Sequence, residues 1–302
     1  MSEINLFTIA NGVMRLESKN VVFERELQVL IEKNMPAFFG VTFLKSEFPI
    51  TNGRMDSIGI DENNCPVIFE YKRSVNENVI NQGLFYLDWL LDHRADFKLL
   101  VMEVLGNDAA ENIDWSMPCV ICIASDFTKF DLHAVNQMQR NIKLVRYKKY
   151  GSDLILFEHL NAPQVNAISD DTPTEAKSER KASSSNNYTF IHSYNSVPQK
   201  TQDLYSDIRN FILTLGDDIT ENQLKLYVAF RKVKNFVCAQ IYRQKILLFL
   251  RLDPDTVELK AGFIEDVRDI GHWGTGDLRI TVGSPSDFEK IKALIDRAYN
   301  EN

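Results

Sequence analysis

The sequence has few cysteines, no long apolar run and no excess of positive charge. Four cysteines in 302 residues are too few for a disulfide-stabilised scaffold. Apolar runs such as Ile246–Leu250 are far shorter than the roughly 20 residues of a membrane-spanning helix. The first residues, Met1–Asn5, lack the basic and apolar regions of a secretory signal. We therefore expect a cytoplasmic protein that does not enter a membrane.

The formal net charge of −8 excludes a general electrostatic attraction to nucleic acid. Any contact with nucleic acid must then come from a local basic patch or from bound metal ions. This argues against a protein that coats DNA nonspecifically, but it leaves a metal-dependent enzyme open.

The composition changes between residues 161 and 200, where proline, serine and asparagine are frequent and large apolar side chains are scarce. Such a segment cannot bury enough surface to offset the entropy lost on ordering. We interpret 161–200 as a linker, with a short ordered piece near Tyr188–Tyr194, between a first domain, 1–160, and a second domain, 201–302. Each domain is long enough to form its own core.

Apolar periodicity and turn residues predict an α/β fold for the first domain, with a mixed sheet flanked by helices. Helices are expected at 23–34, which would end before Pro36, and at 78–93 and 130–140. Strands are expected at 41–48, 53–60, 66–72, 97–104, 119–124, 142–147 and 154–157. The turn residues Asp61–Asn64 indicate that the strands on either side of them form a hairpin.

The second domain is predicted to be a smaller α+β module. Helices are expected at 203–215 and 285–299. Strands are expected at 224–230, 235–242, 245–252, 257–260 and 277–282, the first four as a meander.

The predicted hairpin carries residues that could bind a metal ion. Glu70 and Lys72 are two apart on a strand and therefore point to the same face, and the hairpin can place Asp56 beside Glu70. Two neighbouring carboxylates repel each other unless a cation lies between them, and their oxygens suit Mg²⁺ or Mn²⁺. A metal lowers the pKa of its bound water, and the amine of Lys72 can hold or deprotonate that water.

A Glu-x-Lys pattern is also common in surface hairpins, where it forms an ion pair without a function. Here the pattern follows Val67–Phe69 and encloses Tyr71, which indicates a well-covered strand. Isolated buried charges are costly, so charges kept at such a place favour a functional site.

The residues Asp56 and Glu70-x-Lys72 resemble the signature of the PD-(D/E)XK nuclease superfamily, with Gly53–Asp56 in place of its Pro-Asp element. Glu24 is similar to the acidic residue that this family has on its first helix. The pair Gln82 and Tyr86 resembles the Gln-x-x-x-Tyr motif of the RecB-like branch. These motifs follow the family order across residues 20–125, and the hairpin region is most similar to the NucS-type endonucleases. The proline before Asp56 is missing, a departure that is common in this branch.

The resemblance implies a restriction-endonuclease-like core that cuts phosphodiesters with Mg²⁺ or Mn²⁺. Asp56, Glu70 and the backbone carbonyl of Tyr71 would be metal ligands, and Glu24 would bind the metal directly or through water. Glu26 is the alternative to Glu24, although the Glu-x-x-Leu-Gln spacing favours Glu24.

The remaining predicted site residues would support the metal centre or the substrate. By the same resemblance, Lys72 would position the attacking water, Gln82 would orient the metal site or the phosphate, and Tyr86 would support Gln82. Arg54 and Arg73 are candidate phosphate contacts, although each is also typical of a solvated surface.

The second domain resembles a module of unknown function found at the C-terminus of such proteins, including some called predicted transport proteins. That description does not fit a chain without a membrane span. Its markers are Tyr227–Arg231 and the glycine-rich Gly271–Asp277, which does not follow a P-loop pattern and which we interpret as a structural loop. Basic and aromatic residues between 225 and 245 suit either a nucleic-acid surface or ordinary exposed strands.

We therefore expect a metal-dependent endonuclease or DNA-processing phosphodiesterase, with DNA favoured over RNA as its partner. The alternative is a non-catalytic nucleic-acid-binding or regulatory protein on a nuclease-like fold, which the net charge of −8 supports. A complete acid–lysine set argues against this alternative, because a protein without a catalytic demand has little reason to gather those charges. A third hypothesis gives the second domain a role in recruiting a partner or joining two copies of the chain as a homodimer.

Overall fold

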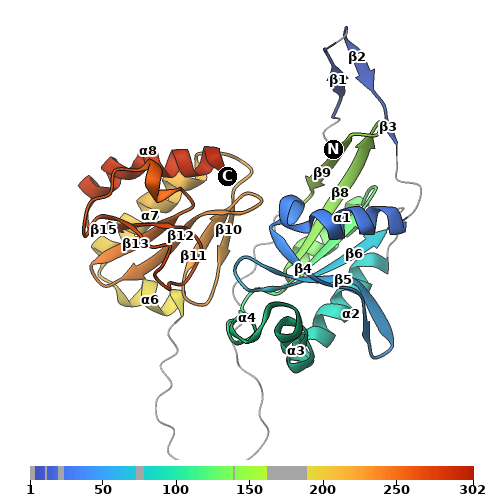
Figure 1. Cartoon of the computed structure of the whole chain (residues 1–302), viewed down its shortest axis with the longest axis horizontal. Coiled ribbons are helices and arrows are strands. Elements are labelled where there is room, and N and C mark those ends of the chain that lie inside the picture. Colours follow the sequence, from blue (N-terminus) through green and yellow to red (C-terminus); the bar gives the residue numbers. More distant parts are fainter. Residues whose placement is uncertain (1–3, 11, 20–23, 73–77, 139, 162–188) are drawn as a thin grey trace, which may run out of the picture. The chain divides into compact units, whose positions relative to one another are not determined.

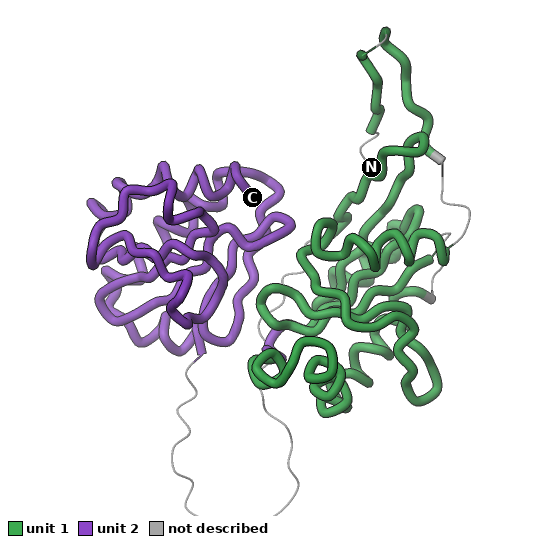
Figure 2. Tube along the Cα trace, viewed as in Figure 1, with its two compact units in different colours: residues 1–113, 118–165 green, residues 114–117, 166–302 purple. Residues whose placement is uncertain are grey.

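A computed structural model describes residues 4–10, 12–19, 24–72, 78–138, 140–161 and 189–302 (Figure 1). The chain divides into two compact units (Figure 2). The first consists of Met1–Ile113 with Pro118–Val165, and the second of Asp114–Met117 with Asn166–Asn302.

The first unit is built on a mixed sheet, which has seven strands among the described residues. Its strand order is β3 (Ser18–Lys19), β8 (Ile142–Tyr150), β7 (Cys119–Ala124), β6 (Pro66–Lys72), β5 (Gly53–Asp61) and β4 (Val41–Ile50), and β9 (Leu154–His159) also pairs with β8. The β6–β7 and β7–β8 pairs are parallel, and the other pairs are antiparallel. Two short strands, β1 (Leu6–Thr8) and β2 (Met14–Leu16), form a separate sheet.

Helices cover the two faces of this sheet. On one face α1 (Glu24–Phe39) packs against alternate residues of β6, among them Phe69 and Tyr71. On the other face α2 (Asn78–Asp92) lies so close to β7 that a Cβ at Gly83 would be 2.8 Å from Val120 Cγ1. The remaining helices of the unit are α3 (Arg94–Leu105), α4 (Asn107–Glu111) and α5 (Lys129–Gln137). The predicted class, a mixed sheet flanked by helices, is therefore confirmed.

Two predictions for the first unit are wrong. The segment 97–104, expected to be a strand, is part of helix α3. Phe97, Leu100 and Val101 are buried at helical spacing, whereas Leu99 and Met102 are exposed, so the apolar run does not have the burial of a strand.

Helix α1 does not end before Pro36 as expected, but continues to Phe39. Its backbone leaves the helical region at Asn34 (φ −127°, ψ 18°), so Pro36 lies just after a break. There the missing N–H and fixed φ of a proline are tolerated, as at the start of a helix.

The second unit is an α+β module, as predicted. Its described strands form an antiparallel sheet in the order β10 (Thr220–Gln223), β11 (Val228–Arg231), β12 (Asn235–Tyr242), β13 (Lys245–Leu250), β15 (Leu278–Val282) and β14 (Ile264–Asp266). Apolar residues of α6 (Phe190–Ser196), α7 (Gln199–Leu213) and α8 (Pro285–Glu301) share one core with this sheet.

Details of the second unit differ from the expectation. The predicted strand 224–230 is only partly a strand: β10 ends before it, and β11 begins within it, at Val228. The predicted strand 257–260 is not a strand, and it follows a short 3₁₀ helix, Pro254–Thr256. Helix α6 lies where a short ordered piece of the linker 161–200 is expected, whereas α7 begins at Gln199, just before the predicted end of that linker. Residues 162–188 of the linker are outside the described part of the chain. None of the helices in the described ranges is long and apolar enough to span a membrane.

Gly59 offers a direct test of the packing between β4 and β5. A Cβ at this position would lie 2.6 Å from both Thr42 O and Val41 Cγ1, so we expect Gly59→Ala to lower the free energy of unfolding by about 1–3 kcal/mol. At Gly271 an added Cβ would meet nothing within 4 Å, so Gly271→Ala should change stability by less than about 0.5 kcal/mol. Urea unfolding measures both, and equal stability of the two variants would contradict this packing.

Candidate functional site

The candidate site lies where the hairpin of β5 and β6 opens. Antiparallel pairs between the two strands run from Ile60 and Pro66 to Ser57 and Phe69. Beyond this point β5 continues along β4, and β6 continues along β7. At the opening, Asp56 Oδ2 accepts a hydrogen bond from the backbone N–H of Tyr71 at 3.0 Å. The Asp56 carboxylate therefore takes the place of a ladder partner and is fixed between the separating strands.

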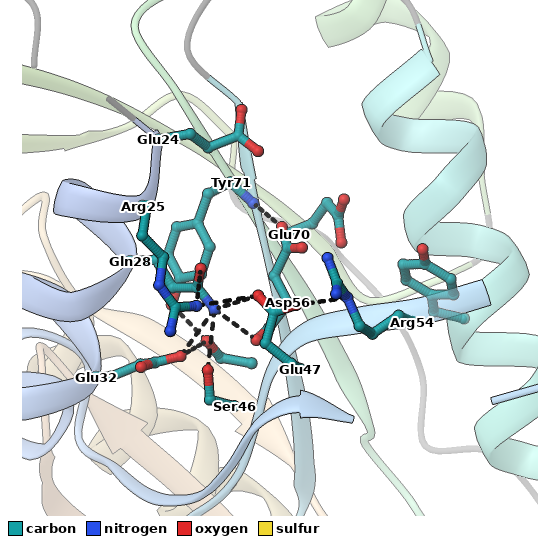
Figure 3. Close-up of polar contacts among 12 residues, drawn as sticks. Glu24, Arg25, Gln28, Glu32, Ser46, Glu47, Arg54, Asp56, Glu70 and Tyr71 are labelled. Carbon is teal, nitrogen blue, oxygen red and sulfur yellow. Dashed lines mark hydrogen bonds and ion pairs between the residues drawn. The ribbon is translucent and has the colours of Figure 1, made fainter. Parts of the chain in front are cut away.

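Glu70 and Lys72 lie at the same opening, on the face of β6 opposite Tyr71. The Glu70 side chain has no solvent exposure, and Lys72 Nζ donates a hydrogen bond to Glu70 Oε1 at 2.9 Å. The Lys72 amine also lies 4.0 Å from Glu24 Oε1, at the start of α1. Figure 3 shows Glu24, Asp56 and Glu70 around this opening. The structure thus brings together the predicted acid–lysine set.

The electrostatics of the site indicate a shortage of positive charge. Burial, together with repulsion by Asp56, raises the pKa of Glu70 to about 8, although Lys72 opposes this shift. Burial also raises the pKa of Asp56, against the hydrogen bond from Tyr71 N–H. Burial alone would lower the pKa of Lys72, but the hydrogen bond to Glu70 and the nearby carboxylates raise it overall. One ammonium group thus does not compensate both carboxylates.

These groups fit a divalent cation. Glu70 Oε2 is buried and has no hydrogen-bond partner, so it offers an oxygen that a cation would satisfy. Within the described ranges, no group of three or more His, Cys, Asp and Glu side chains could hold a metal ion. A metal at this opening would therefore rely on Asp56 and Glu70, with backbone or water oxygens completing its shell. Mg²⁺ is commonly bound in this way, through one or two carboxylates, waters and substrate phosphates.

Gln82 and Tyr86 pair with each other on helix α2. Gln82 Nε2 donates a hydrogen bond to Tyr86 Oη at 2.8 Å, which is the support that the sequence motif predicts. The Tyr86 ring lies against the start of β5, because a Cβ at Gly53 would be 3.1 Å from Tyr86 Cε1. This hydrogen bond joins the two side chains to each other and not to Asp56 or Glu70.

The other predicted residues lie at the margin of the site or outside the described chain. Arg54 is 62% exposed and forms an ion pair with Glu47, and Arg73 falls outside the described residues. Glu24 and Glu26 are both exposed, but Glu24 Oε1 lies 4.0 Å from Lys72 Nζ, so the geometry favours Glu24 over Glu26.

Gln28 is a site residue that the sequence reasoning missed. Its side chain is only 4% exposed, and Nε2 lies 2.8 Å from the backbone carbonyl of Asp56. Further acceptors lie within hydrogen-bond distance of Nε2: Glu32 Oε1 at 2.9 Å, and Ser46 Oγ and Glu47 Oε1 at 3.2 Å. Gln28 therefore holds the backbone that carries Asp56. The available signal was the Glu-x-x-Leu-Gln spacing itself, which ends at Gln28.

A second polar connection reaches the same strands from the α1 side. Tyr71 Oη donates to Ser57 Oγ at 3.2 Å, and Ser57 Oγ donates to Glu32 Oε1 at 2.7 Å. Because Glu32 also accepts from Gln28, the network links both strands of the hairpin to the first turns of α1.

Comparison with known proteins finds a relative of the whole chain. An uncharacterized protein of Haemophilus influenzae is 31% identical over 308 residues, covering 99% of this chain and 100% of that protein. Residues 192–302 match a family described as a domain of unknown function, DUF5655.

Three solved structures show a weak likeness. A repair endonuclease from Pyrococcus abyssi is 16% identical, with a TM-score of 0.29 over 47% of this chain and 65% of that one. EndoMS in its apo form is 20% identical, with a TM-score of 0.28 over 44% of this chain and 49% of that one. An EndoMS–dsDNA complex is 19% identical, with a TM-score of 0.26 over 44% and 50%. The chain spans half to two thirds of the length of these proteins, and a likeness at this level does not indicate a shared activity.

The raised pKa of Glu70 predicts how stability depends on pH when divalent cations are removed with EDTA. Between about pH 4.5 and pH 8 the folded protein keeps a proton that the unfolded chain has released. Stability therefore falls as pH rises through this window, with a contribution of up to about 1.4 kcal/mol per pH unit from this group.

Urea unfolding of wild type, Glu70→Gln and the exposed control Glu26→Gln tests this sign. Glu70→Gln should remove the contribution, so its stability relative to wild type should improve as pH rises, while Glu26→Gln should follow wild type. Parallel profiles for wild type and Glu70→Gln would show that Glu70 is not the titrating group.

Proposed function

The chain belongs to the same family as the uncharacterized Haemophilus influenzae protein, and we propose that it is a metal-dependent phosphodiesterase that cuts nucleic acid, with DNA as the favoured substrate. The observation that carries this proposal is the fully buried Glu70 carboxylate, hydrogen-bonded by Lys72 and coupled to Asp56, with one oxygen left unpartnered. The ordered motifs from Glu24 to Tyr86 support it.

Asp56, Glu70 and the backbone carbonyl of Tyr71 would hold Mg²⁺ or Mn²⁺. A divalent ion at such a site activates a water molecule and offsets the negative charge of the phosphate. The Tyr71 N–H keeps one oxygen of Asp56 in place, and Gln28 fixes the backbone on which Asp56 is carried.

Lys72 would act as a cationic donor. Without a bound metal, the hydrogen bond to Glu70 and the nearby carboxylates raise the pKa of Lys72 against the effect of burial, so its side chain is an ammonium at neutral pH. Since Lys72 is 17% exposed, its amine can reach both the buried Glu70 and a molecule at the opening. It would orient the attacking water or hold a phosphate oxygen, while Glu24 contributes a further negative charge nearby.

The second candidate is a non-catalytic nucleic-acid-binding protein. One observation favours it over a metal-dependent enzyme: the described ranges hold no group of three or more His, Cys, Asp and Glu side chains that could bind a metal ion. The two candidates predict different effects of a Lys72 substitution: only the phosphodiesterase would lose DNA cleavage.

Cleavage assays separate them. With Mn²⁺ and supercoiled plasmid, single-stranded DNA, branched DNA or structured RNA, we expect wild type to cut DNA. Lys72→Ala and Asp56→Asn should lower the rate by about 10²- to 10⁴-fold, the range for a positioned group that acts on the reacting atoms. Glu26→Gln, the matched acidic control on α1, should cut like wild type. Equal cleavage by wild type and Lys72→Ala would refute the catalytic assignment, and binding without cleavage by any form would favour the second candidate.

A further inference from the structure

Glu47 has an unusual backbone conformation directly beside the candidate site. It lies in β4 between Ser46 and Phe48, whose partners in β5 are Ser57 and Met55, so Glu47 is opposite Asp56. Its φ of +55° is in the left-handed region, which costs a residue with a Cβ roughly 1–3 kcal/mol. A strand needs no such residue, so the surrounding contacts must hold Glu47 in place.

The Glu47 carboxylate joins two arginines from different elements. Its Oε1 accepts a hydrogen bond from Arg25 Nη1 at 3.1 Å, and its Oε2 lies 2.5 Å from Arg54 Nε. Arg25 comes from the first turn of α1, and Arg54 from the start of β5 (Figure 3). Two guanidinium groups are therefore held beside a single carboxylate.

This arrangement is tied to the candidate site. Gln28 Nε2 lies within hydrogen-bond distance of both Glu47 Oε1 and the backbone carbonyl of Asp56. Arg54 is two residues before Asp56 on the same strand. The position of the two arginines is thus fixed relative to Asp56 through both a side-chain contact and the backbone.

The arrangement has the chemistry of an anion site. The side chains of Arg25 and Arg54 are 61% and 62% exposed, and exposed ion pairs contribute little to stability, so these pairs alone do not explain the conformation of Glu47. Arg25 Nη1 also donates to Gln28 Oε1 at 3.1 Å. Each guanidinium has five N–H donors, so these contacts leave other donors for a further partner. Planar guanidinium groups suit the oxygens of a phosphate.

We propose that Arg25 and Arg54, oriented by Glu47, bind a backbone phosphate of a polynucleotide next to the phosphodiester at Asp56 and Glu70. Arg25, Arg54 and Glu47 together carry a net charge of +1, which suits one phosphate of an acidic partner. The phosphate site rests on the proposed function, because its ligand is the polynucleotide that the enzyme would cut. It narrows the substrate to phosphodiesters within a polynucleotide chain, since a mononucleotide has no neighbouring phosphate that could bind Arg25 and Arg54.

Salt-dependent binding tests the proposal without cleavage. The anisotropy of a fluorescein-labelled DNA duplex is measured in EDTA at about 50 to 200 mM salt, where each neutralised phosphate contributes about 0.9 to the slope of log affinity against log salt. The double variant Arg25→Gln/Arg54→Gln should bind more weakly and lose about 0.9 of the slope. The control Arg209→Gln/Arg297→Gln removes the same charge from two carboxylate-paired arginines of the second unit and should keep the wild-type slope.

An unchanged slope in Arg25→Gln/Arg54→Gln would overturn the proposal, and so would an equal loss in both double variants. Glu47→Gln keeps both arginines, so it should retain the slope while binding several-fold more weakly. Tighter DNA binding by Glu47→Gln would overturn the orienting role of Glu47, because it would show that the carboxylate acts only by repelling phosphate. Equal competition by inorganic phosphate or a mononucleotide would indicate a site for free phosphate and overturn the polynucleotide assignment.

The outcomes also distinguish this site from the proposed activity. Wild type that binds with an arginine-dependent slope but cuts no DNA would refute the phosphodiesterase and leave the phosphate site standing. Wild type that cuts DNA while Arg25→Gln/Arg54→Gln keeps the full slope would refute the phosphate site alone.

Discussion

The burial of the Glu70 carboxylate beside Asp56 is the constraint on which the rest of the candidate site depends. A carboxylate without solvent contact needs compensation, and Lys72 supplies it at one oxygen only. Every other feature of the opening acts on this pair of acids: Tyr71 N–H fixes the Asp56 carboxylate, and Gln28 fixes its backbone. A cation that enters between the two acids would replace the proton that Glu70 otherwise keeps up to about pH 8, and would relieve the repulsion between the two carboxylates. The geometry therefore favours metal-dependent chemistry over a passive ion pair.

Much of this site could be predicted from the sequence, because it depends on local periodicity. The two-residue spacing of Glu70 and Lys72 sets their common face, and the turn at Asp61–Asn64 sets the hairpin that returns β6 to Asp56. The pairing of Gln82 with Tyr86 likewise follows from the spacing of a helix. These relations involve one element or two adjacent elements, so no knowledge of the tertiary fold is needed.

The features of the fold and the site that could not be predicted from the sequence depend on contacts between segments far apart in the chain. The left-handed backbone at Glu47 and its two arginines cannot be inferred from a strand pattern, because they need α1, β4 and β5 together. The prediction of a strand at 97–104 was wrong for a related reason. The apolar run is only partly buried, and which of its side chains face the core depends on the fold. In the second unit, the match to a domain of unknown function agrees with a separate α+β module.

Calorimetric titration with Mn²⁺ near pH 8 measures whether Asp56 and Glu70 together hold a divalent cation. We expect one bound ion per chain in wild type, loss of that binding in Asp56→Asn and in Glu70→Gln, and retained binding in Lys72→Ala, whose side chain is not a ligand. A wild type that shows no heat of binding, or Asp56→Asn and Glu70→Gln variants that bind Mn²⁺ as tightly as wild type, would show that these carboxylates do not form a metal site.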